Sequence, residues 1–273
     1  MIFVDSHVHI YDCFDVDLLL DSALKNFQSA AKQHTIAQQT SSYVLLLTEC
    51  ARDNWFQQQL TTFQDSKSKH GAFARRWCVV GSREEDSMVV CRNDSSEDKI
   101  HLVAGRQAVT KEKIEVLALF FKKSISNGMS LHETIDAIRQ ADGIPVLPWG
   151  AGKWLGKRGG ILKAFLSAQG KSNLFLGDNG GRPQFWPTPN LFDLAEKKGI
   201  SVLPGSDPLP LPGEAGRVGS FGFYLHGNSS YSDSPTVYLK KALCSAKTTP
   251  VPFGRLQKNS MFLFNQLRLR LSI

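Results

Sequence analysis

Short apolar runs alternate with longer amphipathic segments along most of the chain, and this alternation constrains the fold more than any other feature. Tyr43–Leu47 is a continuous apolar run of strand length, which is typical of a strand buried on both faces. In Asp17–Gln33 the apolar residues recur with a helical period. Strands that alternate with helices predict a parallel sheet with the helices packed outside it. The other predicted strands of this pattern are Ile2–Val4, Ile114–Phe121, Ile144–Leu147, Asn173–Leu176, Ile200–Leu203 and Phe221–Leu225.

Residues 75–105 break the alternation. Three short β-prone runs, Trp77–Val80, Ser87–Cys91 and Ile100–Val103, are separated by polar stretches, as in an antiparallel meander. About seven strands that alternate with helices fit a closed α/β barrel better than a short open sheet. No Gly-x-Gly-x-x-Gly follows the first strand, which argues against dinucleotide binding. We therefore expect one domain over residues 1–273, with a β meander inserted at 75–105.

The chain is moderately basic. Lys and Arg number 32 against 25 Asp and Glu, which gives a net charge of +7 and a pI near 9.2. This excess suits either an anionic substrate or simply a soluble basic surface, and the sequence leaves both open. No RNP, zinc-finger or basic-zipper pattern occurs, so no nucleic-acid partner is expected.

The cysteines and the apolar runs indicate the compartment. Five cysteines without a Cys-x-x-Cys pair favour reduced thiols in the cytoplasm. The first residues include Asp5, too early a charge for a signal peptide. No apolar run approaches the ~20 residues of a membrane helix. We expect a cytoplasmic protein that needs no membrane, and an oligomer is compatible with the sequence.

Two histidines follow the first predicted strand directly, in Asp5-Ser6-His7-Val8-His9. In an extended segment, residues two apart face the same side, so both imidazoles point to one place. Neutral imidazoles that converge at the carboxyl end of a strand make half of a divalent metal site. The alternative is a pair of hydrogen-bonded histidines at a barrel mouth.

A carboxylate follows a late predicted strand, in Gly205-Ser206-Asp207. Across a barrel, Asp207 would face the histidines, where it could ligate a metal ion or accept a proton from a water molecule bound to the ion. Gly-Ser-Asp is also ordinary turn chemistry, so its value lies in the pairing with the histidines.

These segments, with four others, resemble the motifs of the polymerase-and-histidinol-phosphatase (PHP) domain family. Asp5–His9 looks like the opening Asp-x-His-x-His of the family, and Gly205–Asp207 like its final Gly-Ser-Asp-x-His. The resemblance implies a distorted (β/α)7 TIM-like barrel that binds metal ions and hydrolyses phosphoesters. The other similar segments are Leu47–Cys50 at Leu-Thr-Asp-His, Ala104–Gln107 at Pro-Gly-x-Glu, Ile114–Leu117 at x-His-Val-Leu, and Gly143–Leu147 at Gly-Ile-Pro-Val-Leu.

The chain also departs from the family motifs at several ligand positions. Three metal candidates remain at matched positions, His7, His9 and Asp207, and Glu49 and Glu115 are candidate substitutes. This set implies one divalent ion, zinc or manganese, or at most two. The positions that lack the family ligand are Cys50, Gln107, Glu115, Pro148-Trp149 and Leu209.

The resemblance implies a phosphoesterase in which a water molecule activated by the metal attacks the substrate. Asp207 and Glu115 are the candidate catalytic residues. Lys153, in a Gly-rich loop, and Arg182 would hold a small phosphorylated substrate, with Asn179 as a further contact. Two alternatives stay open: an amidohydrolase-like C–N hydrolase, and a catalytically silent barrel that binds an anionic ligand or a protein partner.

Overall fold

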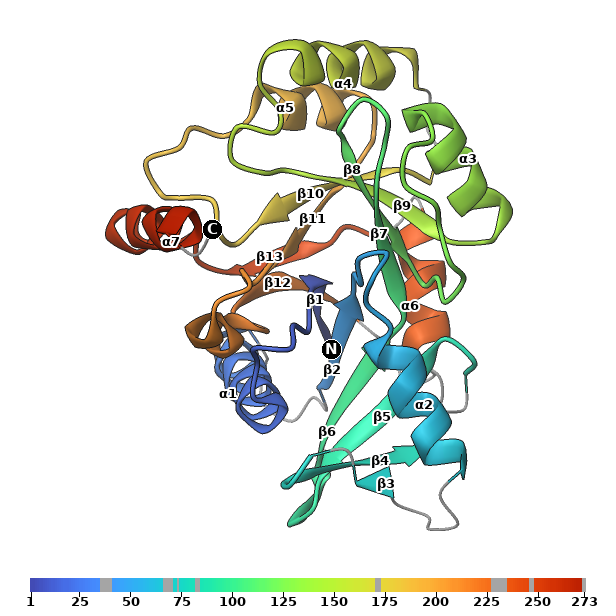
Figure 1. Ribbon diagram of the computed structural model, residues 1–273, viewed down its shortest axis with the longest axis vertical. Coiled ribbons are helices and arrows are strands. Elements are labelled where there is room, and N and C mark those ends of the chain that lie inside the picture. The colour runs from blue at the N-terminus through green and yellow to red at the C-terminus, as the bar shows by residue number, and fades with distance from the viewer. Residues whose placement is uncertain are drawn as a thin grey trace.

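The computed structural model describes residues 1–34, 41–65, 71–72, 74–81, 84–169, 173–226, 235–245 and 248–271. Strands and helices alternate over much of this chain (Figure 1). The strands are β1 Ile2–Val8, β2 Ser42–Leu47, β3 Gly71–Ala72, β4 Trp77–Gly81, β5 Ser87–Arg92, β6 Ser95–Val103, β7 Gly105–Val109, β8 Glu115–Leu119, β9 Ile144–Pro148, β10 Phe175–Asn179, β11 Val202–Gly205, β12 Phe221–Leu225 and β13 Val251–Gly254. The helices are α1 Val16–His34, α2 Trp55–Asp65, α3 Leu131–Gln140, α4 Gly156–Ala168, α5 Asn190–Lys197, the 3-10 helix η1 Pro212–Arg217, α6 Pro235–Cys244 and α7 Asn259–Leu271.

The strands form two mixed sheets, so the expected closed (β/α)7 barrel is wrong. An eight-stranded sheet has the order β13-β12-β1-β2-β6-β5-β4-β3, and a five-stranded sheet has the order β11-β10-β9-β8-β7. Only part of each sheet is parallel. In the larger sheet the parallel pairs are β1 with β2 and β2 with β6, and in the smaller sheet they are β9 with β10 and β10 with β11.

The antiparallel pairs explain why the barrel prediction fails. β7 and β8 are joined by a hairpin, in which Lys113 donates its N–H to the Thr110 carbonyl at 2.9 Å, and no helix crosses between them. Strands joined by a short turn run antiparallel, whereas parallel neighbours need a long crossover. β12 likewise follows β11 through η1 and pairs antiparallel with β1.

The strands between residues 75 and 105 belong to the larger sheet. β4 pairs antiparallel with β5, and β5 with β6, over the predicted β-prone runs. β6 then lies parallel to β2, so these strands extend the eight-stranded sheet downward in Figure 1.

The two sheets approach each other where β1 meets β11. The Ser6 hydroxyl donates to the Pro204 carbonyl at 2.8 Å, and the Asp207 N–H donates to the His7 carbonyl at 2.9 Å. Gly205 makes this approach possible, because a Cβ atom there would lie 2.5 Å from both the backbone nitrogen and the Cβ of His7. The ends of β1 and β11 are thereby held side by side.

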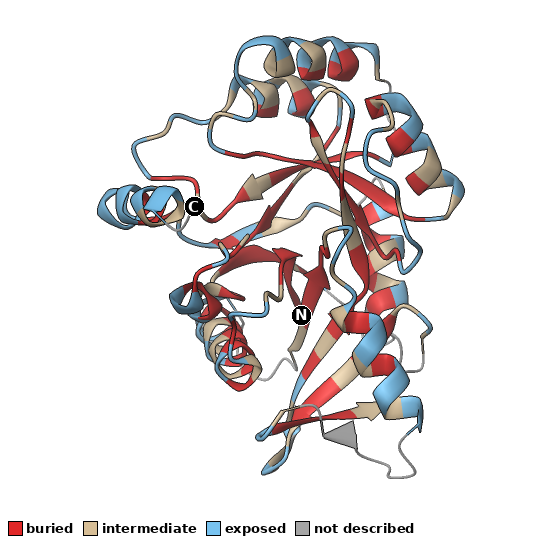
Figure 2. Ribbon diagram, viewed as in Figure 1, coloured by how far each residue is buried: buried red, intermediate tan, exposed pale blue. Residues whose placement is uncertain are grey.

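The buried apolar residues form three clusters, and buried residues run along the strands of both sheets (Figure 2). Alternate residues of β1 face opposite ways, as the period of a strand requires: Phe3 packs towards α1, and Ile2 and Val4 pack between the two sheets. α3, α4 and α5 cover the outer face of the five-stranded sheet. Among the described residues, no helix is long and apolar enough to cross a membrane.

Candidate metal centre

A buried carboxylate in the middle of β1 organises the loops of the candidate site. Asp5 is fully buried and accepts the backbone N–H groups of Ser206 and Gly219, each at 2.8 Å, and that of His7 at 3.3 Å. Burial raises the pKa of Asp5 to about 6, and the hydrogen bonds that it accepts oppose this rise. Asp5 thus ties the turn after β11 to the strand that carries the histidines.

The two histidines face each other. The Nε2 atoms of His7 and His9 are 3.1 Å apart, and both side chains are only 4% exposed. The ring of His9 stacks on Tyr11, with 5.3 Å between the ring centroids and 24° between the planes. The extended backbone at this point brings both imidazoles to one side, as the sequence predicted.

Asp207 completes the cluster from the turn after β11. Its Oδ1 lies 3.4 Å from Nε2 of His7 and 3.7 Å from Nε2 of His9. Its Oδ2 accepts a hydrogen bond from the side-chain amide of Asn179. Asp207 has φ of 43°, a left-handed conformation that Asp adopts more readily than most residues. One ligand atom from each of the three residues lies within 4.8 Å of the others.

Burial keeps both imidazoles neutral. It lowers the pKa of His7 to about 4, an effect that Glu115 opposes, and it lowers the pKa of His9 to about 3. Burial also raises the pKa of Asp207, against the attraction of His9 and Lys153. Neutral imidazole nitrogens are the form that binds metal ions.

The chemistry of the donor set fits a divalent metal ion. Two imidazole nitrogens and one carboxylate oxygen converge, which is the number and type of ligands in open catalytic sites. Nδ1 of His9 is buried without a hydrogen-bond partner among the described residues. Its Nε2 faces Nε2 of His7 and a carboxylate oxygen of Asp207, and a metal ion bound between these atoms would replace the close approach of two ring nitrogens with ligand bonds.

Glu49 and Glu115, the predicted substitute ligands, lie outside this cluster. Glu49 is 5% exposed; one oxygen accepts the N–H of Phe56 at 2.7 Å, at the start of α2, and the other pairs with Arg106 at 2.9 Å. Burial raises the pKa of Glu49, and the Phe56 and Arg106 interactions oppose the rise. Glu115 forms an ion pair with Lys153 through Oε1, and the roles predicted for both residues stay predictions.

The remaining predicted binding residues are also engaged. Arg182 is buried and forms a two-pronged ion pair with Asp178, in which both contacts are 2.8 Å. Asn179 contacts Asp207, as described above, and its amide nitrogen also lies 3.5 Å from the Trp149 carbonyl. Asn179 thus contacts the cluster directly, and Lys153 lies near enough to influence the pKa values of His7, His9 and Asp207.

Two residues near the cluster were not singled out from the sequence as site residues. Asp5 was part of the motif, and the signal that could have identified its role is a carboxylate within an otherwise apolar strand. Gln107 lies close enough to both histidines to oppose the fall of their pKa values, and its amide nitrogen approaches Sγ of Cys50 at 3.9 Å. Gln107 had been noted only as a substituted ligand position.

Comparison with known proteins gives a fold but no family. No family model matches the chain, and no curated protein matches it. PsfC from Pseudomonas syringae PB-5123 has a similar structure, with a TM-score of 0.56, 13% identity, and coverage of 99% of this chain and 98% of PsfC. The PHP resemblance therefore rests on the motifs alone.

Endonuclease Q has a similar structure as well. The lesion-specific endonuclease PfuEndoQ from Pyrococcus furiosus has a TM-score of 0.53 at 10% identity, with coverage of 92% of this chain and 58% of that one. An Endonuclease Q in complex with a 27-mer duplex substrate, with an abasic lesion at the active site, has a TM-score of 0.50 at 11% identity, with coverage of 88% and 56%. This chain thus spans little more than half the length of these endonucleases.

The expected partners require correction. The sequence predicted a small anionic substrate and no nucleic acid, because it has no recognised nucleic-acid motif. Against this expectation stands Endonuclease Q, a protein of similar fold whose structure contains a 27-mer duplex substrate with an abasic lesion at the active site. Binding of nucleic acid depends on surface shape and charge, which short motifs do not report.

Proposed function

We propose that this protein is a metal-dependent hydrolase of nuclease type that cleaves phosphodiester bonds of nucleic acid. The observation that carries the proposal is the convergence of His7, His9 and Asp207 at the junction of β1 and β11. The shared fold with Endonuclease Q supports the substrate class.

The charges around the cluster favour a phosphodiester over a phosphate monoester. Two neutral imidazoles and one carboxylate leave a divalent ion with about one unit of positive charge, which one phosphodiester group balances. The nearby cations are already paired: Lys153 with Glu115, and Arg217 with Glu214 at 2.7 Å. A doubly charged monoester would find no additional unpaired cation in this set.

The roles of the chain's residues follow from their positions. A divalent ion at such a site polarises a phosphoryl oxygen and activates water. His7 and His9 hold the ion through Nε2, and Asp207 through Oδ1, while Asn179 fixes the other oxygen of Asp207 by its hydrogen bond. Asp5 holds the turn after β11 against β1 through the N–H groups of Ser206 and Gly219. Three protein ligands make this a site for one ion, and zinc or manganese suits the donor set.

Elemental analysis of protein purified without chelator tests the metal site. We expect about one equivalent of zinc, manganese or iron in the wild type and in His132→Gln, an exposed histidine of α3 that serves as the control. We expect almost none in His9→Ala. Labelled DNA and RNA oligonucleotides, incubated with added Mn²⁺ and resolved on denaturing gels, test the activity.

The results separate the proposed enzyme from a silent scaffold. Metal-dependent cleavage that His9→Ala abolishes and His132→Gln preserves supports the proposal. Protein that lacks bound metal and leaves DNA and RNA intact would refute it and favour a catalytically silent protein of this fold.

A further inference from the structure

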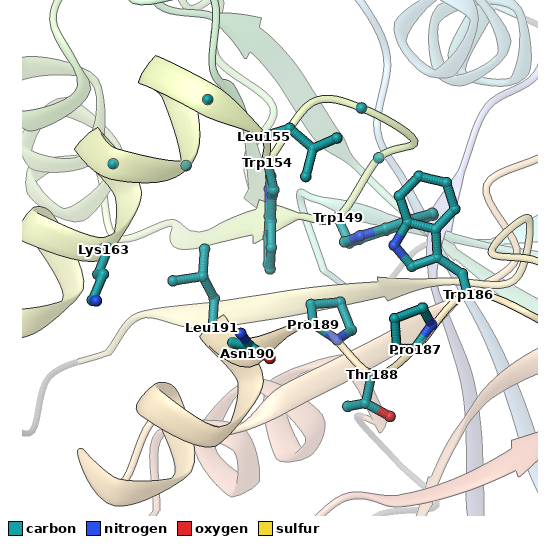
Figure 3. A pocket seen from close by; sticks show the side chains of 15 residues that line it. Trp149, Trp154, Leu155, Lys163, Trp186, Pro187, Thr188, Pro189, Asn190 and Leu191 are labelled. Carbon is teal, nitrogen blue, oxygen red and sulfur yellow. The ribbon is translucent and has the colours of Figure 1, made fainter.

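A pocket with three tryptophans lies next to the candidate metal centre, between α4 and the segment 186–191 (Figure 3). We propose that this pocket binds an unpaired nucleobase of a nucleic acid whose backbone reaches the cluster of His7, His9 and Asp207. The inference rests on the proposed function, because it names where a substrate of that class is held.

The pocket has the size and the walls for a flat ring. Its volume is about 360 Å³, within the range of ligand pockets. Figure 3 shows Trp154 and Leu191 on one side, Trp149 and Trp186 on the other, and Pro189 between them. Aromatic side chains stack on bases of any sequence, because every base has a π-face.

The tryptophans are held in place by other rings. Trp149 packs edge-to-face against Trp186, with 5.6 Å between centroids, and Trp154 packs in the same way against Phe192, also at 5.6 Å. Trp149 is buried, whereas Trp154 and Trp186 are half-buried and keep surface towards the pocket. Rings held in this way lose little conformational entropy when a base stacks on them.

The charge of the pocket suits a polyanion. Its lining residues include no Asp or Glu, and their one cation, Lys163, is exposed. Lys163 has no ion-pair partner within the described part of the chain, in contrast to Lys153 and Arg182. A base in the pocket would thus have a free ammonium group within reach of the adjoining phosphates.

Glycines keep the pocket open. Gly152, Gly156 and Gly160 all line it, and a Cβ atom at any of them would meet nothing within 4 Å. Gly156 has φ of 57°, and Gly152 has φ of 71°, so both are restricted in what can replace them. Gly160 lies within α4 without this restriction, so a larger side chain there would occupy the pocket without disturbing the backbone.

One residue connects the pocket to the metal cluster. The amide nitrogen of Asn179 donates to Asp207 and lies 3.5 Å from the carbonyl of Trp149, whose side chain forms a pocket wall. The backbone N–H of Trp149 donates to the carbonyl of Gly177 at 2.8 Å, which holds Trp149 against β10. The wall of the pocket and the metal cluster thus share Asn179 as a direct contact, so a nucleotide with its base between the tryptophans would lie beside the cluster.

Fluorescence anisotropy with two probes tests the inference. One probe is a labelled single-stranded DNA of about twelve nucleotides, and the other is an oligomer of equal length made only of abasic units, with the same phosphates. We expect the wild type to bind the first at least about fivefold more tightly, since one stacked base contributes about 1–3 kcal/mol. Trp154→Ala should weaken binding of the first probe by about 5- to 150-fold.

Gly160→Leu blocks the pocket without removing any side chain, and Gly160→Ala is its matched control. We expect Gly160→Leu to abolish the preference for the base-containing probe and Gly160→Ala to keep it within about twofold of the wild type. Thermal melts show that each variant is folded. Equal binding of the two probes by the wild type, or an unchanged preference in folded Gly160→Leu, would overturn the inference.

Metal content and cleavage of the wild type, measured beside its preference for bases, separate this inference from the proposed function. A preference for bases in wild-type protein that neither binds metal nor cleaves nucleic acid supports the pocket and refutes only the nuclease. Cleavage and bound metal without any preference for bases support the nuclease and refute only the pocket.

Discussion

Gly205→Ala should disrupt the junction that brings the candidate ligands together. A Cβ atom at residue 205 would lie 2.5 Å from the nitrogen and from the Cβ of His7, and 3.0 Å from its Cα. Carbon atoms in contact are normally ~3.5–4.0 Å apart, so β1 and β11 must separate by roughly 1 Å. The clashing atoms of His7 are its N, Cα and Cβ, which a change of side-chain rotamer cannot move away.

The magnitude follows from two contributions. Overpacking of a close-packed site costs about 1–3 kcal/mol. Separation of the strands also strains the hydrogen bond from Asp207 to His7 and that from Ser6 to Pro204, each of which contributes about 1 kcal/mol. We therefore expect the free energy of unfolding to fall by about 3–5 kcal/mol. We also expect the affinity for the metal to fall by about 10- to 100-fold, the usual effect of displaced ligand supports.

Urea denaturation and metal titration measure these two effects. The control is Gly213→Ala in η1, where a Cβ atom would meet nothing within 4 Å and where a change within about 0.5 kcal/mol is expected. If Gly205→Ala matches Gly213→Ala in both stability and metal affinity, the junction does not position the ligands and the reasoning fails.

Three further predictions concern the site and the sheet around it. Asp5→Asn should lower the free energy of unfolding by about 2–3 kcal/mol in urea, because an amide cannot accept the Ser206 and Gly219 N–H groups on separate oxygens; a loss below about 1 kcal/mol would contradict this. Burial, reinforced by Lys99, lowers the pKa of His101 from 6.5 to about 4. As the pH falls, His101 is therefore protonated in the unfolded chain before it is protonated in the folded chain. Stability should therefore drop by up to about 3 kcal/mol from pH 6.5 to 4, and His101→Leu should flatten that slope in denaturation curves; an equal slope argues against it. EDTA should lower the melting temperature of the wild type but not of His9→Ala, since an ion present at about 1,000 times its Kd stabilises by about 4 kcal/mol; a wild-type melting temperature that EDTA leaves unchanged would count against a bound ion.

Local sequence signals predicted many of the elements and the core of the candidate site. The apolar runs at Tyr43–Leu47 and Ile144–Leu147 correspond to β2 and β9. Ser130 and Glu133 form a capping box at the start of α3, a pattern that is local in sequence. His7 and His9 face one another because the period of a strand fixes their direction, and this period is a property of a few consecutive residues.

The pairing of strands was beyond the sequence pattern. The alternation of strands and helices predicted one closed parallel barrel, but β7 was absent from that pattern and makes a hairpin with β8. β12 was predicted as a strand, yet nothing in Phe221–Leu225 indicates that it runs antiparallel to β1. Direction and neighbour depend on contacts between segments far apart in the chain, which local periodicity does not encode.

The sequence likewise did not predict which carboxylates pair with the charged residues of the site. Lys153 and Arg182 were predicted to hold an anion because the sequence shows cations in Gly-rich loops. In the folded chain, Glu115 and Asp178 already neutralise them. Which carboxylate pairs with a cation depends on the fold and not on the local sequence, and the binding of an anion by Lys153 and Arg182 stays a prediction.

Trp149 stands where the PHP motif has a histidine, and the folded chain indicates a role for it that the sequence did not. Its position resembles that of a histidine ligand in the PHP motif, so the sequence indicated only that a ligand is missing there. Its backbone is held between Gly177 and Asn179, and its ring lies against Trp186 in the wall of a separate pocket. A residue that cannot bind metal thus contributes an aromatic surface beside the remaining ligands. Trp149→His would test whether the position still faces the cluster: a second equivalent of metal in this variant would show that it does, whereas an unchanged metal content with weakened binding of the base-containing probe would place its role in the pocket.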